Sequence, residues 1–223
     1  MTTVDETTGA HAAETRAADA AAAEAAATAG ANPALIGVPT FVIGSVALGL
    51  YLIGFTGSSA NAAIGMVPIL FVCTGLGQTI AAIWAIREGA GAVAAIFGIF
   101  SGFWLSFATL VVGLGHNWFG DATVDGAAVA AQETFLLTWL IGVVVLTLAS
   151  LRLPSAFTAL FALIAVALLL VLLGTSSGST GLLFGGGIAV FAFVLIGVYL
   201  FFDAMGQATG AKALPLGKPL VGG

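Results

Sequence analysis

The sequence predicts an all-α membrane protein whose six transmembrane helices form a bundle. Hydrophobic residues make up 60% of the 223 residues and charged residues 7%, and the mean hydropathy is +1.17. Soluble domains carry roughly 25% charged residues, so this composition indicates a chain that folds in lipid. Its apolar runs are long enough for spans of about 20 residues, the length that crosses a hydrocarbon layer of about 30 Å. The chain has room for six such spans and short loops, but not for a second folded domain.

Hydropathy places the spans at residues 35–55, 62–86, 92–114, 135–151, 155–173 and 182–202. The connection between the third and fourth spans is the only long one, and its Trp118 and Phe119 are typical of the aromatic belt at a membrane interface. Small residues such as Gly98 and Gly102, a GxxxG pair in the third span, predict close packing between helices.

Three segments follow from this pattern. Residues 1–31 form an alanine-rich tail with five acidic residues and one arginine, and we expect it to be disordered and cytoplasmic. It lacks the basic region and apolar core of a signal peptide. Residues 32–206 form the domain of six transmembrane helices, and residues 207–223 form a cytoplasmic C-terminal segment.

The basic residues predict the orientation. All five flank the spans on one side of the membrane: Arg16, Arg87, Arg152, Lys212 and Lys218. The loops on the opposite side carry no lysine or arginine and include acidic residues. The positive-inside rule therefore predicts a protein of the plasma or inner cell membrane with both termini in the cytoplasm, and an even number of spans agrees.

No charged side chain lies in the middle of the predicted spans. Asp203 and Arg152 stand at span ends, and His116 stands at the outer end of the third span. The sequence offers no acid–base pair, metal-ligand cluster or phosphate-binding motif attached to a catalytic group. We therefore expect no enzymatic activity, no cofactor, no bound metal and no nucleic-acid partner; the lipid bilayer is the expected surrounding.

A few polar side chains do lie within the spans, and Gln78, Thr74 and Ser101 are the candidates to line a pore. Hydroxyl groups on membrane helices usually bond to their own backbone, which favours a structural role for Thr74 and Ser101. The primary amide of Gln78 must bond to a neighbouring helix or face water, and the sequence leaves both open.

The first span opens with the stretch ANPALIGVPTF. Asn32 can cap the helix, and Pro33 suits its first turn, where a missing N–H costs nothing. Pro39 lies further in and cannot bond to the carbonyl of Leu35, so the helix bends and that carbonyl is free. A free carbonyl is tolerated where it meets water, either at the mouth of a permeation path or at a kink hydrated by the interface.

These residues carry a family resemblance. NPALIGVPTF resembles the NPAPLGL-type signature of the acetate uptake transporter family, the acetate and succinate permeases, with Asn32, Pro33 and Gly37 as its matching entrance residues. GLGQTIAAIWAIREG, FGIFSGFWLSFATL and KALPLGKP resemble further stretches of the family in the same order. The resemblance covers residues 32–218. Leu35 replaces the second proline of the signature, and Pro39 is an addition.

The resemblance implies six-helix protomers, each with its own pore, that assemble as a homohexamer. It also implies a central apolar constriction, which falls on Phe41, Phe100 and Ile164, with Leu163 as the alternative to Ile164. Counting about 1.5 Å per residue from the cytoplasmic ends places Phe41, Gln78, Phe100 and Ile164 roughly 9 to 14 Å deep, nearly at one level.

The expected function is a membrane transporter or channel for small monocarboxylates, with acetate as the substrate, succinate as a further candidate and a link to protons. Transfer of an anion from water to an apolar medium costs far more than transfer of a neutral group, so we expect the acid to cross the constriction in its neutral form. A urea, amide or other small neutral solute channel is the alternative, because a charge-free pore suits such solutes equally well. A membrane scaffold or sensor that transports nothing is the third possibility.

Overall fold

The structure is a computed structural model that describes residues 15–16, 32–55, 57, 60–119 and 126–222. The predicted tail, residues 1–31, therefore lies almost entirely outside the described residues. The elements are the helices α2 (Ala34–Leu52), α3 (Ala60–Pro68), α4 (Leu76–Arg87), α5 (Gly91–Gly115), α6 (Ala127–Ala149), α7 (Ser155–Ser177) and α8 (Thr180–Ala208), the π-helix η1 (Ile69–Gly75) and the 3-10 turn η2 (Ser150–Arg152).

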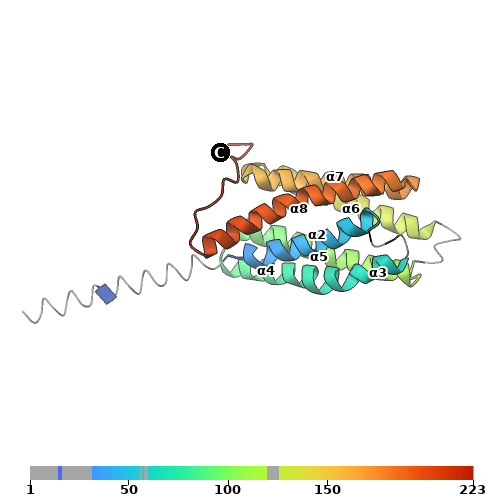
Figure 1. Cartoon of the computed structure of the whole chain (residues 1–223), viewed down its shortest axis with the longest axis horizontal. Coiled ribbons are helices and arrows are strands. Elements are labelled where there is room, and N and C mark those ends of the chain that lie inside the picture. Colours follow the sequence, from blue (N-terminus) through green and yellow to red (C-terminus); the bar gives the residue numbers. More distant parts are fainter. Residues whose placement is uncertain (1–14, 17–31, 56, 58–59, 120–125, 223) are drawn as a thin grey trace, which may run out of the picture.

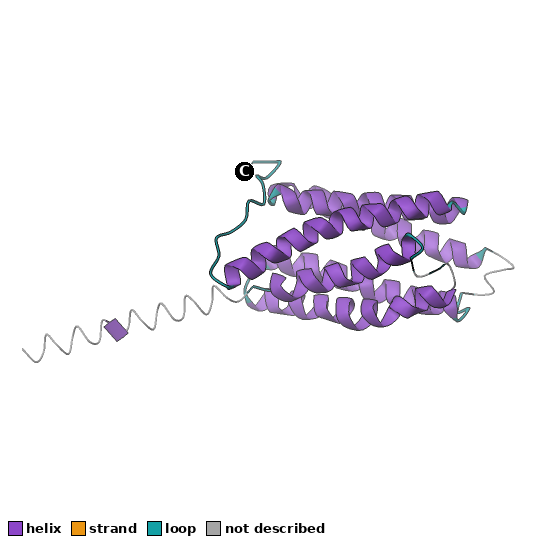
Figure 2. Ribbon diagram, viewed as in Figure 1, coloured by secondary structure: helices purple, strands orange, loops and turns teal. Residues whose placement is uncertain are grey.

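Six helical segments of the described chain are long and apolar enough to cross a membrane, which confirms the predicted fold class. They run up and down in one bundle, and the described residues contain no strand (Figures 1 and 2). The second span, Ala62–Arg87, is built from most of α3, η1 and α4 in succession.

The six spans form a ring. α8 packs against both α2 and α7, and α6 packs against α7. On the other side, η1 and α4 pack against both α2 and α5, and the ring closes where α5 meets α6 (Figure 1). Side chains from α2, α5, α6, α7 and α8 therefore face a common interior.

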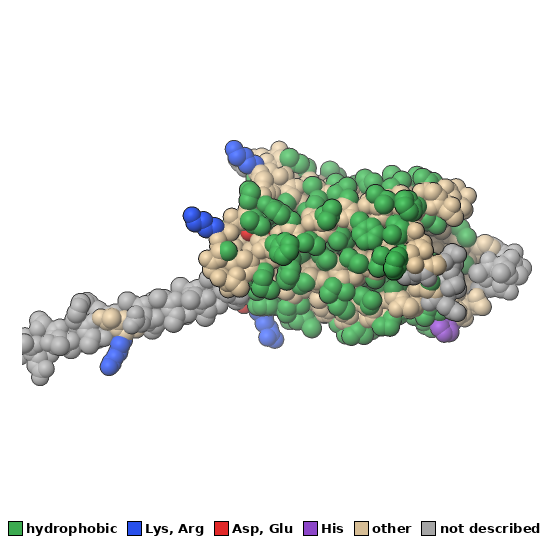
Figure 3. All heavy atoms as spheres, in the orientation of Figure 1, with side chains coloured by type: hydrophobic (Ala, Val, Ile, Leu, Met, Phe, Trp, Pro, Cys, Tyr) green, Lys and Arg blue, Asp and Glu red, His purple; other side chains and the backbone are tan. Residues whose placement is uncertain are grey.

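The basic residues gather at one end of this ring. Arg87 ends α4, Arg152 ends η2, and Lys212 and Lys218 lie in the segment that follows α8. Lys and Arg side chains are accordingly seen at the end of the bundle where α2 begins (Figure 3). We call this the basic end and the other the far end.

Two predicted span boundaries were wrong in ways that matter for the site. The fourth span begins at Ala127 rather than at residue 135, because polar side chains that suggested a loop bond to their own helix: Gln132 Nε2 donates to the Ala128 carbonyl at 3.1 Å. The last helix continues to Ala208 rather than ending at residue 202. Asp203 is therefore not terminal but lies within α8, where it is 7% exposed.

The second span changes its winding in the middle. Pro68 has no N–H to offer the preceding turn, and the π-helical residues begin directly after it. At the junction with α4, the Gly75 carbonyl accepts hydrogen bonds from Thr79 Oγ1 at 2.9 Å and from Ser101 Oγ of α5 at 3.1 Å. The hydroxyls satisfy a carbonyl at the π-to-α transition and tie α4 to α5.

The C-terminal segment, residues 209–222, folds back over the basic end. The Leu214 amide donates to Asp203 Oδ1 at 2.7 Å, and Tyr199 donates to the Pro215 carbonyl at 3.0 Å. The Leu216 carbonyl accepts from the Ala156 amide at 3.0 Å, which attaches the segment to the start of α7. The segment thereby covers part of the basic end of the ring.

Candidate permeation pathway

Three cavities follow one another inside the ring. The basic-end cavity has a volume of about 200 Å³, the central cavity about 50 Å³ and the far-end cavity about 320 Å³. The central cavity shares lining residues with each of the other two, so the three form one discontinuous path between the ends of the bundle.

Two aromatic rings separate the basic-end cavity from the central cavity. Phe41 of α2 and Phe100 of α5 line both cavities, and their ring centroids are 5.2 Å apart in an edge-to-face arrangement. Phe193 of α8 and Phe161 of α7 extend this cluster, with centroids 5.7 Å from Phe41 and 5.9 Å from Phe100 respectively. We call Phe41 and Phe100 the aromatic gate.

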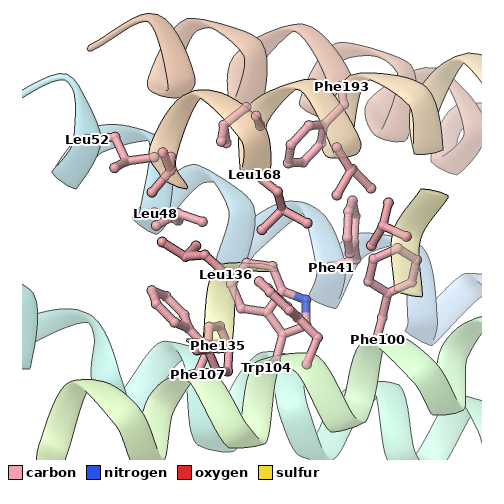
Figure 4. A pocket seen from close by; sticks show the side chains of 16 residues that line it. Phe41, Leu48, Leu52, Phe100, Trp104, Phe107, Phe135, Leu136, Leu168 and Phe193 are labelled. Carbon is pink, nitrogen blue, oxygen red and sulfur yellow. The ribbon is translucent and has the colours of Figure 1, made fainter. Parts of the chain in front are cut away.

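The central cavity is almost entirely hydrocarbon. Ile164, Leu168 and Leu136 are among its lining residues, and Figure 4 labels Leu168 and Leu136. Of the side chains of its 16 lining residues, only that of Trp104 contains a polar atom. Trp104 is 1% exposed, and its indole contacts the Phe41 ring at a centroid distance of 6.2 Å.

The outer two cavities are more polar than the central one. The basic-end cavity is lined by Asn32, Gln78 and Asp203 as well as by apolar side chains, and Leu216 of the C-terminal segment contributes to its wall. The far-end cavity includes Tyr51, Gln132 and Thr175. A small polar solute would therefore find hydrogen-bonding groups on both sides of an apolar middle.

The entrance residues shape the first turns of α2. Asn32 Oδ1 accepts a hydrogen bond from the Ala34 amide at 3.0 Å, and Pro33 precedes the first residue of the helix. Gly37 is buried against the Phe97 ring, and a Cβ at this position would lie 2.3 Å from that ring. Any side chain at residue 37 would thus require the Phe97 ring to move.

Gln78 bonds to a neighbouring helix, one of the two alternatives that the sequence left open, and it also lines a cavity. It is fully buried, and its Nε2 donates to the Gly37 carbonyl, which connects α4 to α2. Its Oε1 has no hydrogen-bond partner within the described part of the chain, and the residue lines the basic-end cavity. The amide therefore fastens two helices and leaves an acceptor beside the path.

The other candidates lie outside the three cavities. Thr74 is buried in η1, and its hydroxyl packs so closely against Gly44 that a Cβ on Gly44 would overlap it. Ser101 Oγ shares a hydrogen bond with Thr79 Oγ1 at 2.6 Å. Leu163 is half-buried and packs against the core, whereas Ile164 lines the central cavity. The structure thus brings together Phe41, Phe100 and Ile164, with Gln78 on the basic side, and leaves Thr74, Ser101 and Leu163 in helix contacts.

Sequence reasoning missed Trp104, Phe161, Phe193, Asp203 and Leu216, which all line the pathway. Trp104 could have been found, since it follows Phe100 by four residues and so shares its face of the helix. Phe161 carries the same kind of signal, since it precedes Ile164 by three residues, whereas Phe193 carries none, because an aromatic residue within a span is usually core. Asp203 was missed because the end of α8 was predicted too early.

The comparisons with known proteins agree with this architecture. Residues 15–213 match the GPR1/FUN34/yaaH family. The chain is 30% identical over 173 residues to Ammonia transport outward protein 2 of Saccharomyces cerevisiae and 29% identical over 196 residues to Accumulation of dyads protein 2 of the same yeast. The alignments cover 74% and 85% of this chain but only 58% and 65% of those relatives.

A solved structure shares the fold. The structure of the bacterial acetate channel SatP superimposes with a TM-score of 0.71 and covers 84% of this chain and 99% of that one. The sequence identity of this pair is 18%, so the match establishes a common arrangement of helices. The family match begins at residue 15, within the segment predicted as a tail.

Proposed function

The chain belongs to the GPR1/FUN34/yaaH family, and on this basis we propose that it is a transporter or channel for small monocarboxylates, acetate above all, with one pore in each protomer. It is a multi-pass membrane protein and not an enzyme. The observation that carries the proposal is the succession of three cavities along the ring, in which the aromatic gate separates a polar vestibule from an apolar centre.

The solute crosses the centre as the neutral acid. Apart from the indole nitrogen of Trp104, the side chains lining the central cavity are hydrocarbon, so an anion there would lose its hydration without compensation. Protonation of a carboxylate whose pKa in water is about 4.3 costs only about 3.7 kcal/mol at pH 7. Since the proton travels with the acid, uptake is linked to the proton gradient without a proton relay in the protein. Succinate, with two carboxyls, crosses more slowly by the same route.

The assembly and orientation belong to the same proposal. Gly98 and Gly102 are exposed on α5, where small residues allow another helix to approach closely, and this supports association of protomers. A homohexamer is the assembly that the family resemblance implies. The protein lies in the cell membrane with its basic end on the cytoplasmic side, because lysine and arginine are enriched on that side. Native mass spectrometry of the detergent-solubilised protein measures the assembly, and cysteine labelling of residues 116 and 212 measures the orientation.

The test of the function is uptake of labelled acetate and labelled urea into proteoliposomes. We expect acetate to enter faster than it does into protein-free liposomes, in proportion to the amount of inserted protein, and urea to enter at the protein-free rate. Entry of urea alone would support the neutral-solute channel, and entry of neither would favour a membrane scaffold or sensor.

A second candidate has a specific observation in its favour. One of the similar yeast proteins is named for outward ammonia transport, and a path whose central lining residues carry no cation suits a neutral base as well as a neutral acid. Release of ammonia from preloaded proteoliposomes, followed by an internal pH dye, tests this candidate in the same preparation. Acidification of the vesicle lumen that is faster than in protein-free liposomes, because departing ammonia leaves its proton behind, without acetate uptake would replace the first proposal by the second.

A further inference from the structure

The indole nitrogen of Trp104 is a buried donor without an acceptor among the described residues. Trp104 is 1% exposed, and its Nε1 has no hydrogen-bond partner in that part of the chain. Figure 4 shows the indole among the side chains that line the central cavity, with its nitrogen on the side that faces Phe41. A buried donor left without an acceptor costs about 1 to 3 kcal/mol, which a phenylalanine at this position would avoid.

We infer that Trp104 is a binding residue: its Nε1–H donates a hydrogen bond to the carbonyl oxygen of a neutral monocarboxylic acid that pauses in the central cavity. This inference rests on the proposed function and adds a specific subsite to it. The indole supplies the single directional contact, and the surrounding hydrocarbon accepts the alkyl group of the acid.

The chemistry of the cavity selects the form of the ligand. An indole offers one donor and no acceptor, and no cation is among the described residues that line the central cavity. One neutral N–H cannot offset the desolvation of a carboxylate, whereas it suffices for the carbonyl of a neutral acid. The position of Trp104 also places the subsite directly behind the aromatic gate, since its ring contacts Phe41.

The competing explanation is a contact with the aromatic face. The Trp104 and Phe41 rings meet at an interplanar angle of 72°, and an N–H directed at a ring face is a weak hydrogen bond. In that case the nitrogen would stabilise the fold and would have no influence on the solute. Removal of the N–H without change of shape separates the two explanations.

The first measurement is acetate uptake into proteoliposomes at an external pH of about 5, where a substantial fraction of the acid is neutral. Trp104→Phe should lower the uptake rate per inserted protein by about fivefold, the usual effect of one net hydrogen bond. Trp139→Phe is the matched control, because Trp139 also packs edge-on against Phe103, at 5.3 Å, but does not line the central cavity. It should transport acetate at the wild-type rate.

A second variant preserves the shape. Replacement of Trp104 by benzothienylalanine puts a sulfur in place of the N–H and should lower uptake as much as Trp104→Phe does. This variant decides the question if Trp104→Phe fails to insert. Wild-type uptake per inserted protein in the benzothienyl variant would overturn the inference, even if its thermal stability is lower.

The third measurement observes the N–H itself. In protein labelled with ¹⁵N-indole tryptophan, the signal assigned to Trp104 should move when acetate is added at low pH, and sodium chloride should leave it in place. An unchanged signal in a preparation that takes up acetate would overturn the subsite and leave the proposed function intact. Absence of acetate uptake by the wild-type protein would instead contradict the proposed function.

Discussion

The two sides of the central cavity are closed in different ways. Toward the basic end, the shared wall consists of two aromatic rings from two helices, Phe41 and Phe100. Toward the far end, the shared wall consists of six side chains from four helices: Leu48, Leu52, Phe107, Phe135, Leu136 and Val171. Closure of the central cavity therefore depends on one ring contact at the basic end, whereas at the far end several side chains share it.

This difference locates the selectivity of the path. Four of the six far-end side chains are flexible aliphatic groups, so that wall can lose one of them and repack, whereas the edge-to-face ring pair has no substitute for a missing ring. We expect the aromatic gate to decide which solutes cross and the far-end wall to contribute little by itself. Truncation of a side chain on either side tests this contrast, and the pH dependence of uptake tests the apolar character that both walls share.

The largest expected effect is that of pH, because both walls are apolar and each passes only the neutral acid. The neutral fraction of a carboxylic acid with a pKa of about 4.3 rises about 80-fold between pH 7 and pH 5, and uptake of acetate should rise with it. The sign follows from the substrate: lower external pH produces more of the form that crosses. Initial uptake rates over this range, with leakage through protein-free bilayers subtracted, measure the effect.

Asp203 provides the control for that profile. Among the described residues it is the one carboxylate that lines any of the three cavities, and it accepts hydrogen bonds from the Leu214 amide and from Gln207 Nε2. Asp203→Asn removes this carboxylate and should leave the shape of the profile unchanged. Uptake that does not change with pH in the wild-type protein would exclude the neutral-acid route. If the pH dependence disappears only in Asp203→Asn, it originates in the protein and not in the substrate.

Loss of one ring of the aromatic gate should have the next largest effect. Phe41→Ala widens the basic-end wall, so the ratio of succinate to acetate uptake should rise by about tenfold, the scale of discrimination by an apolar pocket. The variant should also lose about 3 to 5 kcal/mol of stability, since Phe41 is 7% exposed. Transport ratios at matched protein abundance separate the two effects.

Phe202→Ala is the control for the gate, because Phe202 lies on α8 with 64% of its surface exposed and lines none of the three cavities. Its uptake ratio should equal that of the wild type. If Phe41→Ala also keeps the wild-type ratio in folded protein, Phe41 is a core residue and the gate lies elsewhere.

Truncation of one side chain of the far-end wall should change the uptake ratio less than truncation of Phe41. Leu48→Ala removes one of six shared side chains, and we expect the ratio of succinate to acetate uptake to change by no more than about twofold because the neighbours repack. The assay is the one used for Phe41→Ala. A larger change in Leu48→Ala than in Phe41→Ala would reverse the contrast and place the selective step at the far end.

The sequence predicted the elements of this path better than their contacts. Hydropathy sufficed for the six spans, and the family resemblance, with a count of depth along each span, selected Phe41, Phe100 and Ile164, which all line the central cavity. The π-helix after Pro68 was not predicted, since a local sequence does not reveal which carbonyls a neighbouring helix will satisfy. The same limit applies to Leu216, whose place in the basic-end cavity depends on the C-terminal segment folding back over it.

The smallest effect is expected for the N-terminal tail, whose composition cannot form a packed core. The family match begins at residue 15, so a deletion of residues 2–14 lies outside the match and a deletion of residues 2–28 enters it. Both deletions should leave acetate uptake per inserted protein within about twofold of the wild type, because this alanine-rich, acidic sequence offers few of the large apolar side chains that form both walls. Proteoliposome uptake with insertion measured by protease protection provides the comparison. If the longer deletion alone abolishes uptake in inserted protein, residues 15–28 act on the basic-end entrance, and closure at that end no longer depends on the aromatic gate alone.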